Sequence, residues 1–145
     1  MTYVPRVLVV TPGTQVVFRN QKSPCQGFQV SGRPRFDHIF NYNVREGTEQ
    51  TVTFRGPDIC PVTCALRPYS KGYVRVVDTP YFAVTDAEGH FAIRDIPKGE
   101  YLVTVWHEGT GNLSKDAGPS EIAITEKGDT ELTYRAAMPK IGLPK

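Results

Sequence analysis

Short runs of β-branched and aromatic residues, separated by turn residues, recur along the whole sequence. In the first half the runs cover residues 7–10, 14–19, 27–31, 49–55, 59–64 and 72–77. Turns such as Thr11-Pro12-Gly13 and Gly56-Pro57-Asp58 lie between them, because proline presets φ and glycine takes positive φ at little steric cost. No window of helical length keeps an apolar spacing of i, i+3, i+4. We therefore predict an all-β chain.

The second half has the same character. Residues 81–107 give the pattern strand, Asp-x-x-Gly turn, strand, Pro-x-Gly turn, strand, with the clearest alternation in the last two strands. Residues 109–120 are rich in Gly, Ser, Asn and Asp and predict a long surface loop. Residues 121–125 and 130–136 alternate as two closing strands. The tail flanked by Pro139 and Pro144 lacks the content to fold alone.

Length and charge favour two domains. The chain has 145 residues and a formal net charge of +2. Residues 1–78 carry ten Lys and Arg against five Asp and Glu, which gives +5, whereas residues 79–145 carry seven against ten, which gives −3. We predict a first domain of residues 1–78 and a second of residues 79–145, with the boundary at Asp78-Thr79-Pro80. Neither half is basic enough to indicate a nucleic-acid partner.

No apolar run approaches the length of a membrane span, and the sequence shows no signal peptide. We therefore expect the chain to have no membrane span of its own.

The run at residues 59–64 contains two of the three cysteines. Cys60, Val62 and Cys64 share one face of the predicted strand, because strand side chains alternate. Pro61 lacks the N–H that a sheet ladder needs and indicates an edge strand. Cys60 and Cys64 are four residues apart, roughly 13 Å along a strand, which is too far for a direct bridge.

Residues 36–44 are rich in aromatic side chains and form either a strand or an ordered loop over one end of a sandwich. Arginine and aromatic side chains are enriched where proteins bind one another. The candidate protein-binding patch consists of Arg33, Arg35, Phe36 and Tyr42. The other interpretation is a loop with ordinary core aromatics.

The stretch Cys64-Ala65-Leu66-Arg67-Pro68-Tyr69-Ser70-Lys71-Gly72-Tyr73-Val74 resembles the C-x-x-H-x-x-M copper loop of the cupredoxin-like family, in particular its plastocyanin-like, "methylamine utilization"-type proteins. Blue copper requires a thiolate, two imidazoles and often a thioether. Here Cys64 keeps the thiol position, but Arg67 and Ser70 occupy the histidine and methionine positions. Gln26 lies in residues 20–28, where relatives place the other histidine.

The resemblance implies a Greek-key β-sandwich of seven or eight strands with a degenerate copper site. Arg67 has no lone pair to donate, and Ser70 offers only a hard oxygen. We therefore expect no copper and no other cofactor. The family is exported, so the resemblance also implies an extracytoplasmic location, periplasmic or cell-surface, with Met1 beginning a mature or trimmed chain.

The resemblance also bears on the cysteines. In relatives the turn that here carries Cys25 and the loop that begins at Cys64 contribute ligands to one ion. It therefore implies a Cys25–Cys64 disulfide where the metal used to lie, with Cys60 left as a buried free thiol. The runner-up pairs Cys25 with Cys60. Three free thiols are expected if the chain is not exported.

The phrases T-D-x-x-G-x-F and P-x-G-x-Y in the second half resemble the carboxypeptidase regulatory-like, transthyretin-type β-sandwich. That resemblance covers most of residues 79–138 and implies a spacer or adhesion module rather than chemistry. Trp106-His107 suggests a contact between the two modules, and a core tryptophan beside a surface histidine is an equally good interpretation.

Catalytic patterns are absent from the sequence. It has no G-x-S-x-G, H-E-x-x-H or phosphate-binding glycine loop, so we do not expect an enzyme. His38, His90 and His107 lie in different predicted elements, which disfavours a three-histidine metal site.

Two functions remain open. The first is a non-catalytic interaction protein, an accessory subunit docked on the extracytoplasmic side of a larger membrane-protein or cell-surface assembly. The second is an electron-transfer protein with an altered metal site built on Cys25, Cys60 and Cys64.

Overall fold

The computed structural model describes residues 3–22, 24–64, 66–113 and 117–136. The chain divides into two compact units, residues 1–93 and 94–145. The division falls later than the domain boundary predicted at Asp78-Thr79-Pro80, and that boundary stays a prediction. The tail with Pro139 and Pro144 lies outside the described residues.

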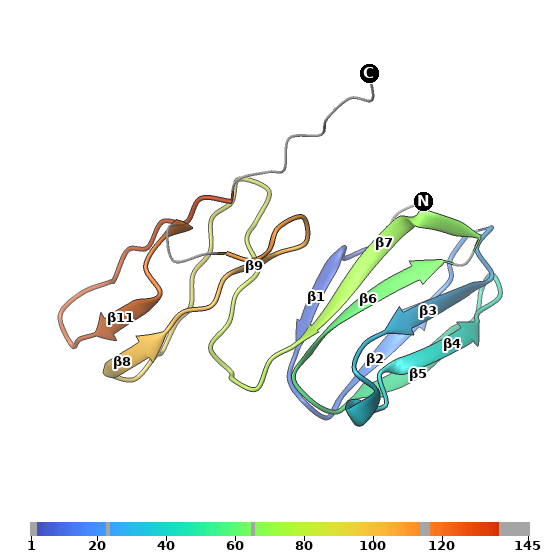
Figure 1. Ribbon diagram of the computed structural model, residues 1–145, viewed down its shortest axis with the longest axis horizontal. Coiled ribbons are helices and arrows are strands. Elements are labelled where there is room, and N and C mark those ends of the chain that lie inside the picture. Colours follow the sequence, from blue (N-terminus) through green and yellow to red (C-terminus); the bar gives the residue numbers. More distant parts are fainter. Residues whose placement is uncertain (1–2, 23, 65, 114–116, 137–145) are drawn as a thin grey trace, which may run out of the picture. The chain divides into compact units, whose positions relative to one another are not determined.

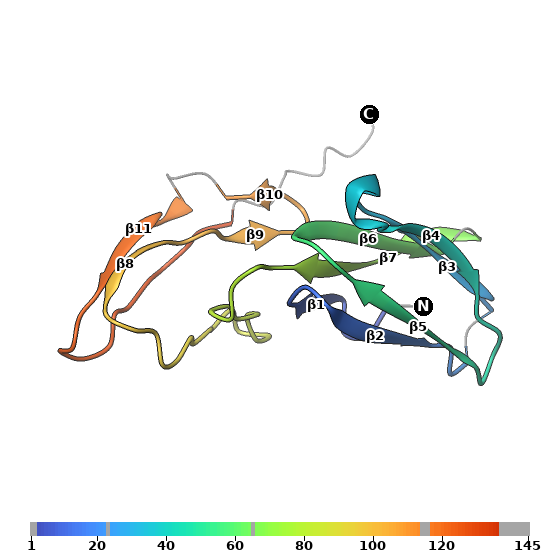
Figure 2. The same ribbon diagram turned by 90° about the horizontal axis from the view of Figure 1, so that it is seen from below.

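In the part of the first unit that the structure describes, seven strands form two sheets (Figure 1). The strands are β1 (Val7–Val10), β2 (Thr14–Arg19), β3 (Gly27–Ser31), β4 (Ile39–Asn43), β5 (Glu49–Phe54), β6 (Asp58–Cys64) and β7 (Arg67–Val76), with a short 3-10 helix, η1 (Pro34–Phe36), before β4. One sheet has the order β1-β7-β6-β3-β4, and the other pairs β2 with β5. Figure 2 shows β2 and β5 as a layer beneath β3, β4 and β6.

Alternation of side chains explains why these segments form a two-layer core. Along β6 every second residue is buried, and β3 buries Phe28 and Val30 while Gln29 stays exposed. Each strand therefore turns one face towards the other sheet, which is the period-two pattern expected of a sandwich. The core consists of Val10, Val16, Phe28, Val30, Val44, Val52, Phe54, Cys60, Val62, Val74 and Val76.

The fold class predicted from the sequence is confirmed. The first unit is a β-sandwich whose topology fits a Greek key, with β1 parallel to β7 and the other recorded pairs antiparallel. The bounds of β1, β2 and β3 coincide with the runs predicted from the sequence. Of the two forms expected for residues 36–44, a strand or an ordered loop, the structure shows the strand, because β4 covers Ile39–Asn43.

The edge position inferred from Pro61 is wrong, because β6 lies between β7 and β3. The recorded pairing of β6 with β3 includes only Val62 with Val30 and Thr63 with Gln29, so it ends at the residue next to Pro61. The proline is therefore accommodated inside the sheet where one neighbouring strand departs.

Two short antiparallel ladders lie in the described residues of the second unit. β8 (Gly99–Leu102) pairs with β11 (Glu121–Ile124), and β9 (Trp106–His107) pairs with β10 (Gly111–Asn112). Its described side chains are exposed or half-buried rather than fully buried. The transthyretin-type sandwich predicted for residues 79–145 stays a prediction.

Several strands predicted in the second half are absent from the described residues. Residues 81–84, 91–93 and 130–136 carry the alternating pattern but have no ladder. The Asp86 N–H donates to the His90 carbonyl in the turn between the first two regions, and in the third region the Arg135 N–H donates to the Ala117 carbonyl. The predicted loop at 109–120 in turn contains β10. Alternation records which side chains face inward, whereas a strand also needs a partner for its backbone.

Among the described residues, no helix is long and apolar enough to cross a membrane.

Phe54 is the aromatic centre of the core, and its truncation should destabilise the first unit strongly. Its side chain is fully buried, and its ring centroid lies 5.2 Å from that of His38 and 6.0 Å from that of Phe40. We expect Phe54→Ala to lower the free energy of unfolding by about 3–5 kcal/mol, because it leaves a cavity. Val17 is 49% exposed, so Val17→Ala, the control, should change it by about 0.5 kcal/mol or less. Denaturant unfolding with the disulfide intact measures both, and equal losses would contradict the assigned core.

Candidate functional site

A disulfide joins Cys25 and Cys64 at one end of the sandwich, with their Cα atoms 6.3 Å apart. This is the pairing that the sequence resemblance implied. Both cysteines are buried. The buried side chain of Asn20 supports the turn that carries Cys25, because its amide donates to the carbonyls of Cys25 and Val44, each at 2.9 Å. This end of the unit is therefore closed by a covalent link and a polar brace.

The positions that the resemblance assigns to copper ligands do not form a copper donor set. Gln26 is exposed, Ser70 is buried, and Arg67 pairs with Cys64 between β6 and β7. Cys64 bonds to Cys25, so its sulfur is not available as the thiolate that blue copper needs. The residues at these four positions do not provide the ligands that a copper ion needs. Ser23 and Ala65, which belong to the two stretches that carry the resemblance, lie outside the described residues.

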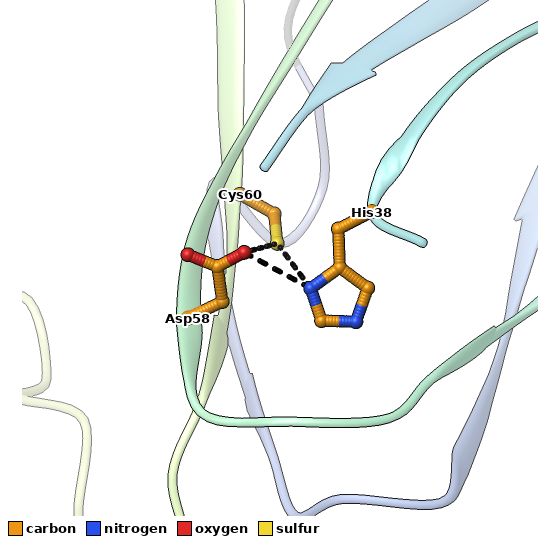
Figure 3. A group of neighbouring side chains, drawn as sticks. All are labelled: His38, Asp58 and Cys60. Atoms are coloured by element: carbon orange, nitrogen blue, oxygen red, sulfur yellow. Dashed lines mark hydrogen bonds and ion pairs between the residues drawn. The ribbon is translucent and has the colours of Figure 1, made fainter. Parts of the chain in front are cut away.

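A second cluster, which the sequence did not reveal, lies near the opposite end of β6. It consists of His38, Asp58 and Cys60, all buried (Figure 3). Asp58 begins β6 and Cys64 ends it, so the cluster and the disulfide are separated by roughly 20 Å of extended strand. His38 comes from the segment between η1 and β4.

Asp58 is the common acceptor of this cluster. Its Oδ2 accepts the N–H of Arg33 at 2.6 Å and faces His38 Nδ1 at 3.0 Å, and its Oδ1 accepts the N–H of Ile59 at 2.8 Å. The Cys60 thiol approaches Oδ2 at 3.5 Å. The carboxylate is thus surrounded by donors from its own strand and from the segment before β4.

The hydrogen bonds of His38 define its tautomer. Its Nε2 lies 3.0 Å from the backbone nitrogen of Arg55, which carries an N–H and only donates. Nε2 is therefore the acceptor, so Nδ1 carries the proton and donates it to Asp58. The neutral imidazole ties β6 to the end of β5.

This geometry shifts the pKa values of Asp58 and Cys60 in opposite directions. Burial by itself raises the pKa of Asp58, but hydrogen bonds from Arg33, His38, Ile59 and Cys60 together outweigh it, and the pKa lies below its ordinary value. Burial raises the pKa of the Cys60 thiol, and the nearby charge of Asp58 and the hydrogen bond to it add to the rise. At neutral pH the cluster therefore holds a carboxylate and a protonated thiol beside an imidazole whose Nε2 accepts a hydrogen bond.

Three potential metal ligands meet here, since one donor atom from each residue lies within 4.8 Å of the other two. A metal on Nδ1 of His38 would move the proton to Nε2, where it would face the N–H of Arg55. A metal on Cys60 would require the thiolate, which burial and Asp58 disfavour. The proton arrangement inferred from these contacts is that of a hydrogen-bonded structural network.

Gly32 allows this network to form. A Cβ at this position would lie 2.6 Å from Asp58 Oδ2 and 2.8 Å from Cys60 Sγ. The Gly32 N–H also donates to the carbonyl of His38 at 2.8 Å. Gly32 is thus a close-packing position.

The structure brings three members of the predicted protein-binding patch together and separates the fourth. Arg33, Arg35 and Phe36 occupy the η1 turn, which we call the arginine tip, with the Arg35 guanidinium 4.6 Å from the centroid of the Phe36 ring. Phe36 also packs against Gly56, where a Cβ would overlap its ring. Tyr42 lies towards the far end of β4.

The surroundings of Tyr42 differ from those of the arginine tip. The ring centroid of Tyr42 lies 6.0 Å from that of Phe28 and 5.6 Å from that of Phe40. The candidate patch is therefore the arginine tip without Tyr42.

Each histidine has its own local partner. His38 bonds to Asp58, the exposed His90 lies 3.6 Å from Asp86, and Nδ1 of His107 accepts the Gly109 N–H at 3.1 Å. These contacts give the ordinary satisfied histidines that the sequence favoured over a metal site. The contact between modules suggested for Trp106-His107 stays a prediction.

Sequence reasoning missed Asp58 because it lies in a Gly-Pro-Asp turn, where a solvated carboxylate is the common case. The alternation of side chains along the strand could have indicated this. Asp58 lies an even number of residues from Cys60, Val62 and Cys64, so its side chain belongs to the same inward face of β6.

No protein-family model matches the chain, and no curated protein matches its sequence. Among solved structures, the chain is similar to an amicyanin variant in its reduced state, with 18% identity and a TM-score of 0.42 over 52% of this chain and 73% of that chain. It is also similar to a novel purple cupredoxin from Nitrosopumilus maritimus, with 20% identity and a TM-score of 0.42 over 52% of this chain and 82% of that chain.

Replacing Asp58 tests the carboxylate's role. In Asp58→Asn the amide N–H group would face donors, so we expect the free energy of unfolding at neutral pH to fall by about 3 kcal/mol. Because the folded pKa of Asp58 is lowered, its contribution is present above the unfolded pKa and is lost as pH falls from about 4 through the folded value.

The difference in stability between wild type and Asp58→Asn should therefore shrink below about pH 4. Denaturant unfolding across pH 2–7 measures it. A difference that stays constant over this range would contradict the role given to the carboxylate.

Thiol reactivity tests the cysteine assignment. Cys60 is buried and its thiol is protonated, so the native protein should react slowly with Ellman's reagent. Unfolding without reductant should expose one thiol per chain, and unfolding with reductant should expose the cysteines of the disulfide as well. A Cys25–Cys60 crosslink in a non-reduced peptide map would overturn the pairing.

Proposed function

We propose that this chain is a non-catalytic interaction protein, an accessory subunit that docks through its first unit on the extracytoplasmic side of a larger membrane-protein or cell-surface assembly. The observation that carries the proposal is the Cys25–Cys64 disulfide. It consumes the one copper-type ligand that the sequence retains, at the place where the resemblance puts a metal, and turns that end into a covalently braced scaffold.

The disulfide also supports the proposed location. Structural disulfides persist in oxidising compartments and are rare in reducing ones. A bridge that closes 39 residues of chain stabilises the folded state by roughly 3–4 kcal/mol in the chain-entropy account.

The arginine tip is the proposed docking surface. Arg33 and Arg35 are exposed, and Phe36 is half-buried beneath the Arg35 guanidinium. The backbone of Arg33 is fixed by its bond to Asp58, so the tip loses little conformational freedom when it binds. Arginine beside an aromatic ring is a common source of binding energy.

The alternative is an electron-transfer protein with an altered metal site. The version built on Cys25, Cys60 and Cys64 is not supported, because Cys25 and Cys64 bond to each other and Cys60 lies four residues along β6. The one observation in favour of the alternative is that donor atoms of His38, Asp58 and Cys60 converge. Stoichiometric metal in elemental analysis of the purified protein would favour it over the interaction protein.

Removal of the tip charges tests the docking proposal. We expect Arg33→Ala combined with Arg35→Ala to weaken association with the native assembly at least tenfold, since hot-spot arginines contribute about 2 kcal/mol or more when desolvated. Lys22→Ala with Lys71→Ala is the charge-matched control, because both lysines are exposed and neither belongs to the tip. Quantitative co-purification of tagged full-length chains measures the effect. Equal retention of both double variants would overturn the proposal.

A further inference from the structure

Strand β4 is an open edge of the five-stranded sheet. It is the last strand in the order β1-β7-β6-β3-β4, and among the described residues only β3 pairs with it (Figure 1). Ile39 is 58% exposed and Tyr42 is 37% exposed. This edge has room for another strand.

The hydrogen bonds at the two ends of the β3–β4 ladder show which backbone groups face outward. The Gly32 N–H donates to the carbonyl of His38, and the Val44 N–H donates to the carbonyl of Gln26, each at 2.8 Å. Both pairs continue the antiparallel register in which Gln29 lies opposite Asn41. In such a ladder bonded and non-bonded pairs alternate, so residues 38, 40, 42 and 44 bond to β3. Residues 39, 41 and 43 therefore turn their N–H and C=O groups to the open edge.

The edge lacks the devices that normally protect an exposed strand. The sequence of β4 is Ile-Phe-Asn-Tyr-Asn, without lysine, other charge or proline, and its recorded register with β3 is regular. Edge strands of soluble proteins commonly carry a charge, a proline or a bulge that prevents pairing. The other strand edges differ from β4. The strands of the other sheet, β2 and β5, carry charges, because Arg19 and Glu49 pair with each other across their ladder. At the opposite edge of the five-stranded sheet, the side chains of β1 are half-buried or buried.

We propose that β4 is a self-association edge, at which a second copy of this chain pairs its own β4 antiparallel to the first. A two-fold axis at Asn41 sets Asn41 against Asn41 and Ile39 against Asn43 of the second copy. In this register outward-facing residues meet outward-facing residues, so their N–H and C=O groups bond reciprocally. The two five-stranded sheets become one continuous sheet of ten strands.

Charge complementarity supports a second copy as the occupant. Asp37 lies two residues before β4 in a turn, with φ 57°, and Arg45 lies two residues after β4; both side chains are exposed. The antiparallel register centred on Asn41 brings the end of β4 that Asp37 precedes near the end that Arg45 follows in the second copy. Asp37 has a weak exposed contact with Arg55 at 3.5 Å, which leaves carboxylate oxygen free for a second guanidinium. The opposite charges favour this register over a shifted one.

This inference is independent of the function proposed above, because the edge and the arginine tip are different surfaces. A five-residue strand buries little area, so the dimer forms at high micromolar concentration and dissociates on dilution.

Asn41→Pro is the direct test. The Asn41 N–H faces the open edge. Proline therefore removes one intermolecular hydrogen-bond donor from each copy and removes no hydrogen bond to β3. Sedimentation velocity on the full chain at 10–500 µM should show the wild type and the control Asn41→Ala passing from monomer to dimer. Asn41→Pro should associate at least tenfold more weakly.

A second variant keeps the test valid if the proline disturbs the fold. Arg45→Glu lies outside β4 and places a carboxylate at the end of the strand that meets the Asp37 end of the second copy, so it should also weaken association. Added salt should narrow the difference in association between this variant and the wild type. A wild type that stays monomeric at 500 µM overturns the proposal. It is likewise overturned if a folded Asn41→Pro, or Arg45→Glu, dimerises as the wild type does.

Discussion

The buried carboxylate of Asp58 is the acceptor on which the ordered end of the first unit depends. It receives the backbone N–H groups of Arg33 and Ile59, the imidazole N–H of His38 and the thiol of Cys60. A buried charge is costly unless its lone pairs are satisfied, and once satisfied it fixes the groups that donate to it. The arginine tip is therefore held by a charge inside the sandwich as well as by apolar packing.

The same network sets the register of the sheet edge. His38 donates to Asp58 through its side chain, and its carbonyl accepts the N–H of Gly32. This carbonyl bond is the first rung of the β3–β4 ladder, so it determines that Ile39, Asn41 and Asn43 present their backbone groups outward. One buried cluster thus orders both surfaces proposed for binding. At the other end of β6 the Cys25–Cys64 disulfide holds the turn between β2 and β3 against the strand.

The core between these two ends consists largely of valine, and a unit of this size buries limited apolar surface. The covalent bridge and the satisfied carboxylate therefore contribute a large share of the order of the sandwich. Neither provides reactive chemistry, because the sulfurs of Cys25 and Cys64 are bonded to each other and the Cys60 thiol stays protonated. These features support the proposed binding role rather than electron transfer.

The sequence by itself determined the local features: the all-β class, the bounds of β1 to β3, and the common face of Cys60, Val62 and Cys64. Turn chemistry and side-chain parity act over a few residues, so the sequence records them directly. The tertiary structure alone decided which strands find partners. It placed the proline-containing β6 inside the sheet and left residues 130–136 without a ladder. It also brought His38 and Asp58, twenty residues apart, to 3.0 Å. Long-range pairing depends on how distant segments pack, and no local pattern encodes that.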